Sequence, residues 1–118
     1  MTIAADVIVG LVATLHVYFL ILEMFLWDKP MGMRAFSQTL EKAQLTKILA
    51  ANQGLYNGFL AAGLVWGLAK GSAGLEIKTF FLCCVLVAGL YGAATASRKI
   101  LFIQAMPAAL GLVLLWLS

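Results

Sequence analysis

Two ionisable residues stand inside an otherwise apolar stretch near the start of the sequence. His16 and Glu23 lie within residues 3–27, and they are separated by about two helical turns, so both side chains share one face of a helix. An imidazole and a carboxylate on one face can exchange protons or line a polar pocket, which makes both residues candidates for catalysis. In the alternative interpretation, Glu23 reaches a polar interface or pairs with Arg98 or Lys99. His16 then only hydrogen-bonds to neighbouring helices.

A second group of polar side chains lies in residues 48–69. Four of them fall within six positions, namely Asn52, Gln53, Tyr56 and Asn57. At about 100° per residue, these four span an arc of roughly 140° on a helix. Such a set can orient a ligand, or it can join helices through polar contacts worth about 1 kcal/mol each or less. Further polar residues come from two later apolar segments. The candidate ligand-binding residues are Glu23, Asn52, Gln53, Tyr56, Asn57, Tyr91, Thr95 and Gln104.

The composition shows what kind of molecule must position these residues. The chain has 118 residues, of which 64% are hydrophobic and 11% are charged, and its mean hydropathy is +1.01. Soluble domains are usually about 45–50% apolar and about 25% charged. A soluble protein this small also needs a large polar surface. The composition therefore excludes soluble and disordered classes and predicts an integral membrane protein.

Four apolar segments approach the length of about 20 residues that a helix needs to cross a bilayer. We expect an all-α membrane protein made of one domain, residues 1–118, with four transmembrane helices and short loops. A polar loop, residues 28–47, is predicted to form an interfacial helix or an extension of the second span. The runs do not alternate as the strands of a membrane barrel do. The predicted spans are residues 3–27, 48–69, 77–95 and 100–117.

The basic residues predict an orientation. Loops one and three carry six of them, whereas Lys70 and Lys78 are the basic residues of the other side. The positive-inside rule places loops one and three in the cytoplasm and both termini outside. Because the basic residues flank spans instead of forming an independent face, the bilayer and not a nucleic acid is the expected partner. The six are Lys29, Arg34, Lys42, Lys47, Arg98 and Lys99.

With this topology, the polar residues of all four spans fall in the cytoplasmic leaflet. The outer halves are almost purely Leu, Val, Ala and Gly. The pattern predicts a polar pocket that opens toward the cytoplasm. Pro107 removes a helix hydrogen bond and frees the carbonyl of Ile103. A kink there would lie beside Gln104 and widen the pocket, or it would only serve packing.

Small residues recur at a spacing that lets membrane helices approach closely, in the pairs Gly54/Gly58 and Gly63/Gly67. The pairs would serve packing inside the bundle or form the face of a homodimer. Cys83 and Cys84 are adjacent, so they point about 100° apart on a helix and suit neither a metal pair nor a disulfide. With one histidine in the chain, we expect no metal site and no cofactor.

Several stretches resemble a bacterial family of small integral membrane proteins catalogued as a domain of unknown function. The first two are residues 16–27, which read HVYFLILEMFLW, and residues 52–63, which read NQGLYNGFLAAG. Looser matches surround Tyr91 with Thr95 and Gln104 with Pro107. The resemblance implies a four-helix membrane protein of about this length, which we expect to be a multi-pass protein of the plasma (inner) membrane of a bacterium. It brings no activity, substrate or cofactor with it.

The leading hypothesis is a protein that binds or transports a small amphiphilic or hydrophobic ligand. Glu23 would supply charge or exchange a proton, the amide side chains would orient the ligand, and Tyr56 and Tyr91 would offer stacking surface. The first alternative is an intramembrane isomerase or hydrolase that acts on a lipid-like substrate through His16 and Glu23. The second is a structural subunit of a membrane complex, in which the polar groups only lock helices together. The sequence leaves enzyme activity open.

Overall fold

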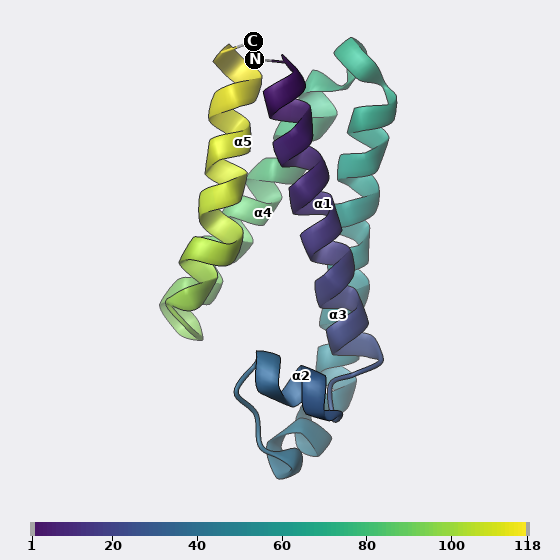
Figure 1. Ribbon diagram of the computed structural model, residues 1–118, viewed down its shortest axis with the longest axis vertical. Coiled ribbons are helices and arrows are strands. Elements are labelled where there is room, and N and C mark those ends of the chain that lie inside the picture. The colour runs from purple at the N-terminus through teal and green to yellow at the C-terminus, as the bar shows by residue number, and fades with distance from the viewer. Residues whose placement is uncertain (1, 118) are drawn as a thin grey trace. The chain divides into compact units, whose positions relative to one another are not determined.

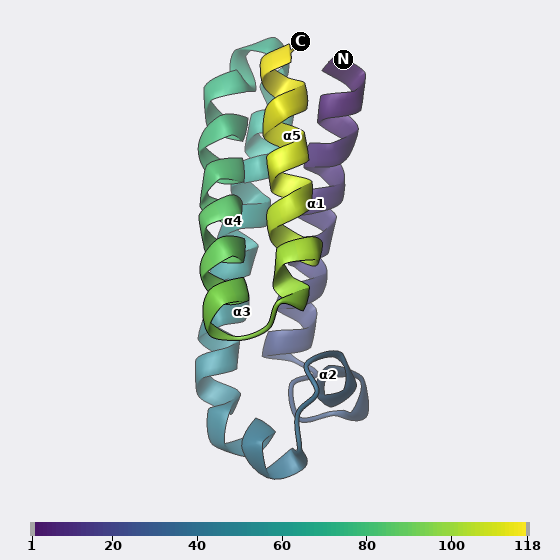
Figure 2. The same ribbon diagram turned by 90° about the vertical axis from the view of Figure 1, so that its left-hand side faces the viewer.

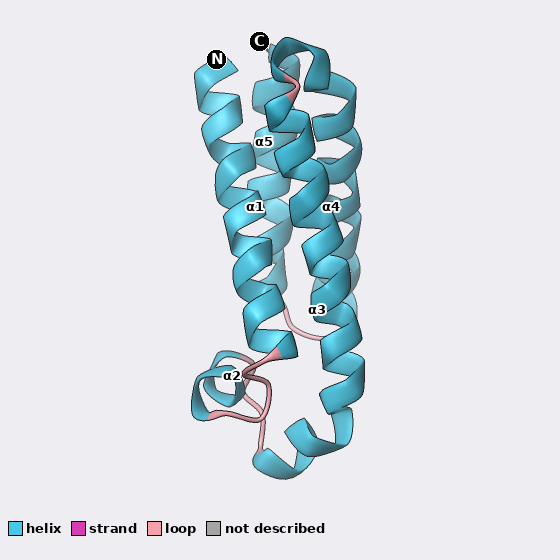
Figure 3. Cartoon of the chain, turned by 90° about the vertical axis from the view of Figure 1, so that its right-hand side faces the viewer, coloured by secondary structure: helices cyan, strands magenta, loops and turns pink. Residues whose placement is uncertain are grey.

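The computed structural model describes residues 2–117, and throughout this range the regular elements are helices and none is a strand (Figure 3). The all-helical prediction is therefore confirmed. The elements are α1 (Thr2–Met24), α2 (Pro30–Ala35), α3 (Leu40–Ala69), a 3₁₀ turn (Gly71–Gly74), α4 (Leu75–Thr95), a π-helical turn (Leu101–Ala105) and α5 (Met106–Leu117).

The chain divides into two compact units. One comprises the residues up to Thr14 and from Leu60 onward, and we call it the bundle unit. The other is Leu15–Phe59, which we call the hairpin unit because it pairs the second half of α1 with the first half of α3. Each unit is described by itself.

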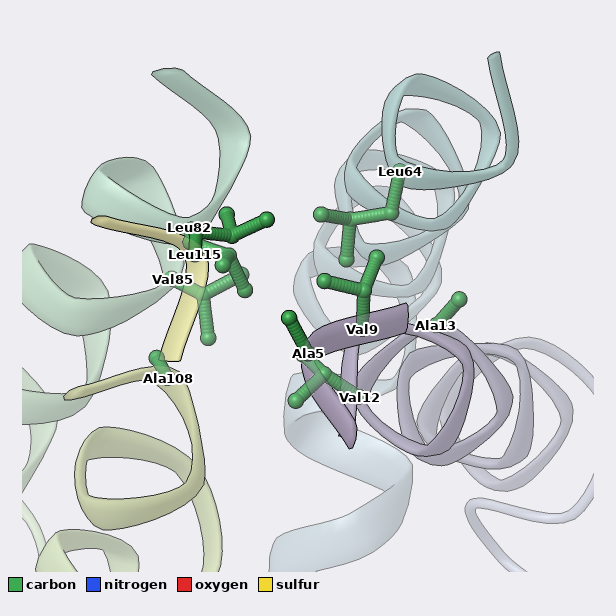
Figure 4. Close-up of a cluster of buried hydrophobic side chains, with 9 residues drawn as sticks. All are labelled: Ala5, Val9, Val12, Ala13, Leu64, Leu82, Val85, Ala108 and Leu115. Atoms are coloured by element: carbon green, nitrogen blue, oxygen red, sulfur yellow. The ribbon is translucent and has the colours of Figure 1, made fainter. Parts of the chain in front are cut away.

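The bundle unit has an apolar core to which four helical segments contribute. Within this unit, the beginning of α1 and the end of α5 lie at the same end (Figure 1), and α4 and α5 lie side by side, joined by a short turn (Figure 2). Leu64 of α3 points toward Val9 of α1 (Figure 4). Such burial of aliphatic side chains is the main force that holds a helix bundle together in water, and close packing takes that role in lipid. The buried core residues, all labelled in Figure 4, are Ala5, Val9, Val12, Ala13, Leu64, Leu82, Val85, Ala108 and Leu115.

The last helix of the bundle unit begins with a wide π-helical turn. The backbone N–H of Met106 donates to the carbonyl of Leu101, one residue further back than in an α-helix. Pro107 follows at once and has no N–H to give to Ile103, so the irregular turn lies where the sequence predicts a disturbed helix. On α4, Gly89 makes room for this turn, since a Cβ at Gly89 would lie 2.7 Å from the backbone nitrogen of Ala105.

The hairpin unit is shaped by two helix boundaries. Helix α1 ends at Met24, three residues before the predicted limit of the first span, and Pro30 starts α2 at the first-turn position that proline favours. Thr39 caps α3, because its hydroxyl oxygen accepts a hydrogen bond from the backbone N–H of Lys42 at 3.2 Å. Helix α3 runs without a break from Leu40 to Ala69. The later part of the polar loop is therefore a helical extension of the second predicted span.

Trp27 is an internal residue of the hairpin unit. Its side chain is 8% exposed and packs with Ala43, Ala50, Met33 and Phe36. Its indole N–H donates to the hydroxyl of Thr46 at 3.0 Å. The side chain thus closes a small core between the α2 segment and α3.

Beside this small core, the Lys47 ammonium lies 3.0 Å from the Asp28 carboxylate. The hydrogen bond and the positive charge from Lys47 lower the pKa of Asp28. This ion pair joins the turn between α1 and α2 to α3, outside the long apolar stretch of α1.

Two helical segments in the described range are long and apolar enough to cross a membrane. They are Ile3–Met24 and Gly71–Thr95, and Leu101–Leu117 is a shorter apolar helix. These segments include most of the first, third and fourth predicted spans.

Candidate functional site

The candidate site lies in the hairpin unit, where α1 and α3 approach each other closely. Gly54 makes this approach possible. A Cβ at Gly54 would lie 2.6 Å from Cγ of Met24 and 3.2 Å from the carbonyl oxygen of Leu20. One turn later, a Cβ at Gly58 would lie 2.7 Å from a methyl group of Leu20. The first glycine pair thus faces α1 of the same chain, as the packing interpretation requires.

The close approach brings Glu23 of α1 against two amide side chains of α3. Nε2 of Gln53 donates to one carboxylate oxygen at 2.6 Å, and Nδ2 of Asn57 donates to the other at 2.5 Å. Glu23 is 2% exposed and Asn57 is 8% exposed. Gln53 and Asn57 are four residues apart, so one face of α3 presents both amides to the carboxylate. The structure thus brings these three candidate residues into contact, and their role in binding a ligand stays a prediction.

The charge of this carboxylate has no basic partner in its own unit. Among the described residues of the hairpin unit, the ion pair is formed by Asp28 and Lys47 and does not involve Glu23. The hydrogen bonds to Glu23 come from the two amides. A structural carboxylate in an apolar helix is normally paired with a cation, since an uncompensated charge is costly there. The Glu23 cluster, which we define as Glu23, Gln53 and Asn57, is thus a buried carboxyl group whose hydrogen bonds come from two amides and not from a cation.

Polar and aromatic side chains continue from the Glu23 cluster onto an exposed face of α3. Asn52 and Gln53 are exposed, and the ring of Tyr56 is 61% exposed. The Tyr56 ring lies 6.1 Å from the Phe59 ring, measured between centroids. We call Asn52, Gln53, Tyr56 and Phe59 the α3 polar face. Exposed amides are ordinary in water, but in a bilayer they need water, a ligand or a protein partner.

His16 is fully buried in the same unit, but the hydrogen bonds of Glu23 do not involve it. The imidazole meets the Phe19 ring edge-on, with 5.5 Å between the ring centroids. Direct proton exchange needs a hydrogen bond or one bridging water. The hairpin unit therefore brings Glu23 together with amides and places His16 in an aromatic contact.

The remaining candidates belong to the bundle unit. Tyr91 is 71% exposed, and Thr95 donates a hydrogen bond to the Tyr91 backbone carbonyl at 2.7 Å. Gln104 lies in the π-helical turn, partly buried. A π-turn often marks a functional position in a helix. Their contribution to one site with the Glu23 cluster stays a prediction.

Sequence reasoning missed an ion pair in the bundle unit. The ammonium of Lys78 lies 3.0 Å from the Asp6 carboxylate, and the Lys78 side chain is 5% exposed. Gly67 lies against the Lys78 stem, since a Cβ there would lie 2.6 Å from Cγ of Lys78. The sequence did hold a signal: in the predicted topology both charges stand near the outer ends of their spans, at similar depth.

The second glycine pair also faces neighbours within the chain. A Cβ at Gly63 would lie 2.4 Å from the Phe81 ring, so Gly63 and Gly67 both make room for α4. A homodimer through either glycine pair stays a prediction. Cys83 and Cys84 are free thiols, the first of them exposed.

Comparison with known proteins gives the relationship. The model of a family described as "Protein of unknown function (DUF1304)" matches residues 10–116. The chain belongs to the DUF1304 family. It is also 33% identical over 115 residues to the "Uncharacterized protein YpaA" of Lactococcus lactis subsp. lactis (strain IL1403), covering 96% of this chain and 97% of that protein. No solved structure matches the chain.

The DUF1304 match confirms the family resemblance that the four stretches of sequence indicate. Residues 10–116 include the whole Glu23 cluster and the α3 polar face. They also include Lys78 but not its partner Asp6. The candidate site therefore lies inside the region that defines the family.

Proposed function

We propose that this DUF1304 protein is a multi-pass protein of the bacterial plasma membrane, with four spans and both termini outside. The two long apolar helices support the membrane location, and the shorter apolar helix supplies a third segment of the right character. The second half of α3 would be the remaining span. The excess of basic residues in the loops 28–47 and 96–100 supports the orientation.

We further propose that the protein binds a small amphiphilic ligand at the α3 polar face, against the Glu23 cluster. The observation that carries this proposal is the buried carboxylate of Glu23, held by two amides and without a basic partner in its unit. An ionisable residue in an apolar helix is costly, and such residues are commonly functional. The exposed Tyr56 and Phe59 rings beside it offer an apolar surface, which an amphiphile requires.

Two other roles of the cluster make different demands. A role as packing glue alone would be fulfilled by glutamine at position 23, which keeps hydrogen bonds to amides without a charge. An enzyme using His16 and Glu23 would need the two groups in proton contact, and the bonds of Glu23 go to Gln53 and Asn57 instead. Ligand binding uses both the charge and the exposed face.

Binding of bulky aromatic probes to the purified protein in mild detergent tests this function. Equilibrium dialysis would follow triphenylphosphine oxide, which is neutral, and tetraphenylphosphonium, a cation of similar bulk. We expect saturable binding of at least one probe, with about one molecule per chain, weakened about tenfold or more in Gln53→Leu. Gln44→Leu is the matched control, because Gln44 is an exposed glutamine of the same helix far from the cluster.

Binding of neither probe above the uptake by empty micelles would contradict the proposed function. Equal weakening by Gln53→Leu and Gln44→Leu would also contradict it, since the α3 polar face would then be no special surface.

A further inference from the structure

We infer that the ligand of the α3 polar face is an organic cation with an apolar body, which lies on the exposed Tyr56 ring and is attracted by the charge of the buried Glu23 carboxylate behind that face. The inference rests on the proposed function and adds the charge of the ligand. Three features of the hairpin unit carry it: the acceptors left open in the Glu23 cluster, the absence of a basic partner there, and the exposed aromatic rings.

The first feature is the balance of donors and acceptors. An ionised carboxylate has about four lone-pair positions, and the two amide bonds to Glu23 leave some of them open. One N–H of each amide is directed at Glu23, so each amide keeps one further N–H and a carbonyl oxygen with two lone pairs. The groups that remain for a ligand are therefore rich in acceptors, which attract a positive charge and repel an anion.

The second feature is the lack of a basic partner for Glu23 within the hairpin unit. Glu23 is 2% exposed, and within the described hairpin unit the Lys47 ammonium is paired with Asp28 instead. In an apolar environment, the attraction between a carboxylate and a cation is much stronger than in water. A ligand cation would supply the compensating charge that the unit itself does not bring to Glu23.

The third feature is the aromatic surface. Tyr56 is 61% exposed and Phe59 is 57% exposed, and their rings lie 6.1 Å apart. Tyr56 follows Gln53 by three residues, so its ring stands about one turn along α3 from the amide that holds Glu23. The faces of aromatic rings carry partial negative charge and bind cations, while their area covers apolar groups. The combination fits a quaternary ammonium or phosphonium ion with bulky substituents.

The test uses two probes that differ almost only in charge, tetraphenylphosphonium and tetraphenylborate. Equilibrium dialysis of the purified full chain in dodecylmaltoside would give both dissociation constants. We expect the cation to bind at least about tenfold more tightly than the anion. Glu23→Gln should abolish this preference, and Tyr56→Leu should reduce cation binding several-fold. Glu41→Gln is the control, because Glu41 is an exposed carboxylate of α3 outside the cluster.

The outcomes separate this inference from the proposed function. Equal affinity for cation and anion, or an unchanged cation preference in Glu23→Gln, would overturn the cation assignment. If triphenylphosphine oxide still bound in a manner dependent on Gln53, the proposed function would survive that result. If Glu23→Gln fails to fold, Tyr56→Leu still tests the inference. The Tyr56 ring is largely exposed, so we expect its replacement to leave the fold intact. Unchanged cation binding in Tyr56→Leu would then contradict the inference.

Discussion

Replacing Asn57 with leucine is expected to lower the free energy of unfolding by about 2 kcal/mol, since a hydrogen bond to a charged group is typically worth about that much. The substitution keeps an uncharged side chain of similar size but removes the donor to one oxygen of Glu23. Because Glu23 is 2% exposed, water has little access to the oxygen that loses its partner. Titration with dodecyl sulfate in mixed micelles would measure the loss.

A double-mutant cycle assigns this loss to the Glu23 contact. In a Glu23→Leu background, Asn57→Leu should cost clearly less, because the carboxylate that needs the donor is gone. An equal cost in both backgrounds would show that Asn57 stabilises the unit by another contact. A negligible cost in the parent chain would contradict the geometry of the Glu23 cluster.

Replacing Gly89 with alanine is expected to destabilise the bundle unit by about 2 kcal/mol, the usual cost of forcing an extra carbon into a filled space. The added Cβ would lie 2.7 Å from the nitrogen and 2.9 Å from the Cα of Ala105. Both are backbone atoms of the π-helical turn, so no side-chain rotation can relieve the contact. Thermal unfolding in detergent, followed by circular dichroism, would report the loss.

Gly10→Ala is the matched control for that substitution. Gly10 is also a helical glycine, but apart from the adjacent backbone of its own helix no atom lies within 4 Å of a Cβ placed there. Alanine is a better helix former than glycine by about 1 kcal/mol, so Gly10→Ala should be neutral or stabilising. If the two alanine variants were equally stable, the close approach of α4 to the π-turn would be wrong.

Much of the helical architecture follows from the sequence. Apolar runs of about 20 residues predict helices, and Asp28, Lys29 and Pro30 predict the break after the first of them. Each of the four predicted spans falls in a helical segment, although α1 already ends at Met24 and α3 begins as early as Leu40. The length of α3 was less predictable, because an interfacial helix and a helical extension have the same apolar spacing. The Thr39 cap, which starts the extension at Leu40, favours the second form.

The candidate site was only partly predictable. Glu23, Gln53 and Asn57 stand out as polar residues in apolar segments, but their distances depend on how closely α1 and α3 pack. Gly54 sets that distance, and its small-residue pattern does not identify the neighbour that it faces. The contact between Lys78 and Asp6 was missed for a similar reason, since both fall inside predicted spans at similar depth but their pairing depends on how α1 and α4 pack.

The most direct test of the Glu23 site as a ligand site is a crystal structure in a lipid mesophase with tetraphenylarsonium, whose arsenic gives an anomalous signal. We expect one arsenic peak per chain, next to the Glu23 carboxylate and the Tyr56 ring, and no such peak in Glu23→Gln. A parent-chain crystal with the cation present but no peak at the α3 polar face, or with its strongest peak elsewhere on the chain, would contradict the proposed site.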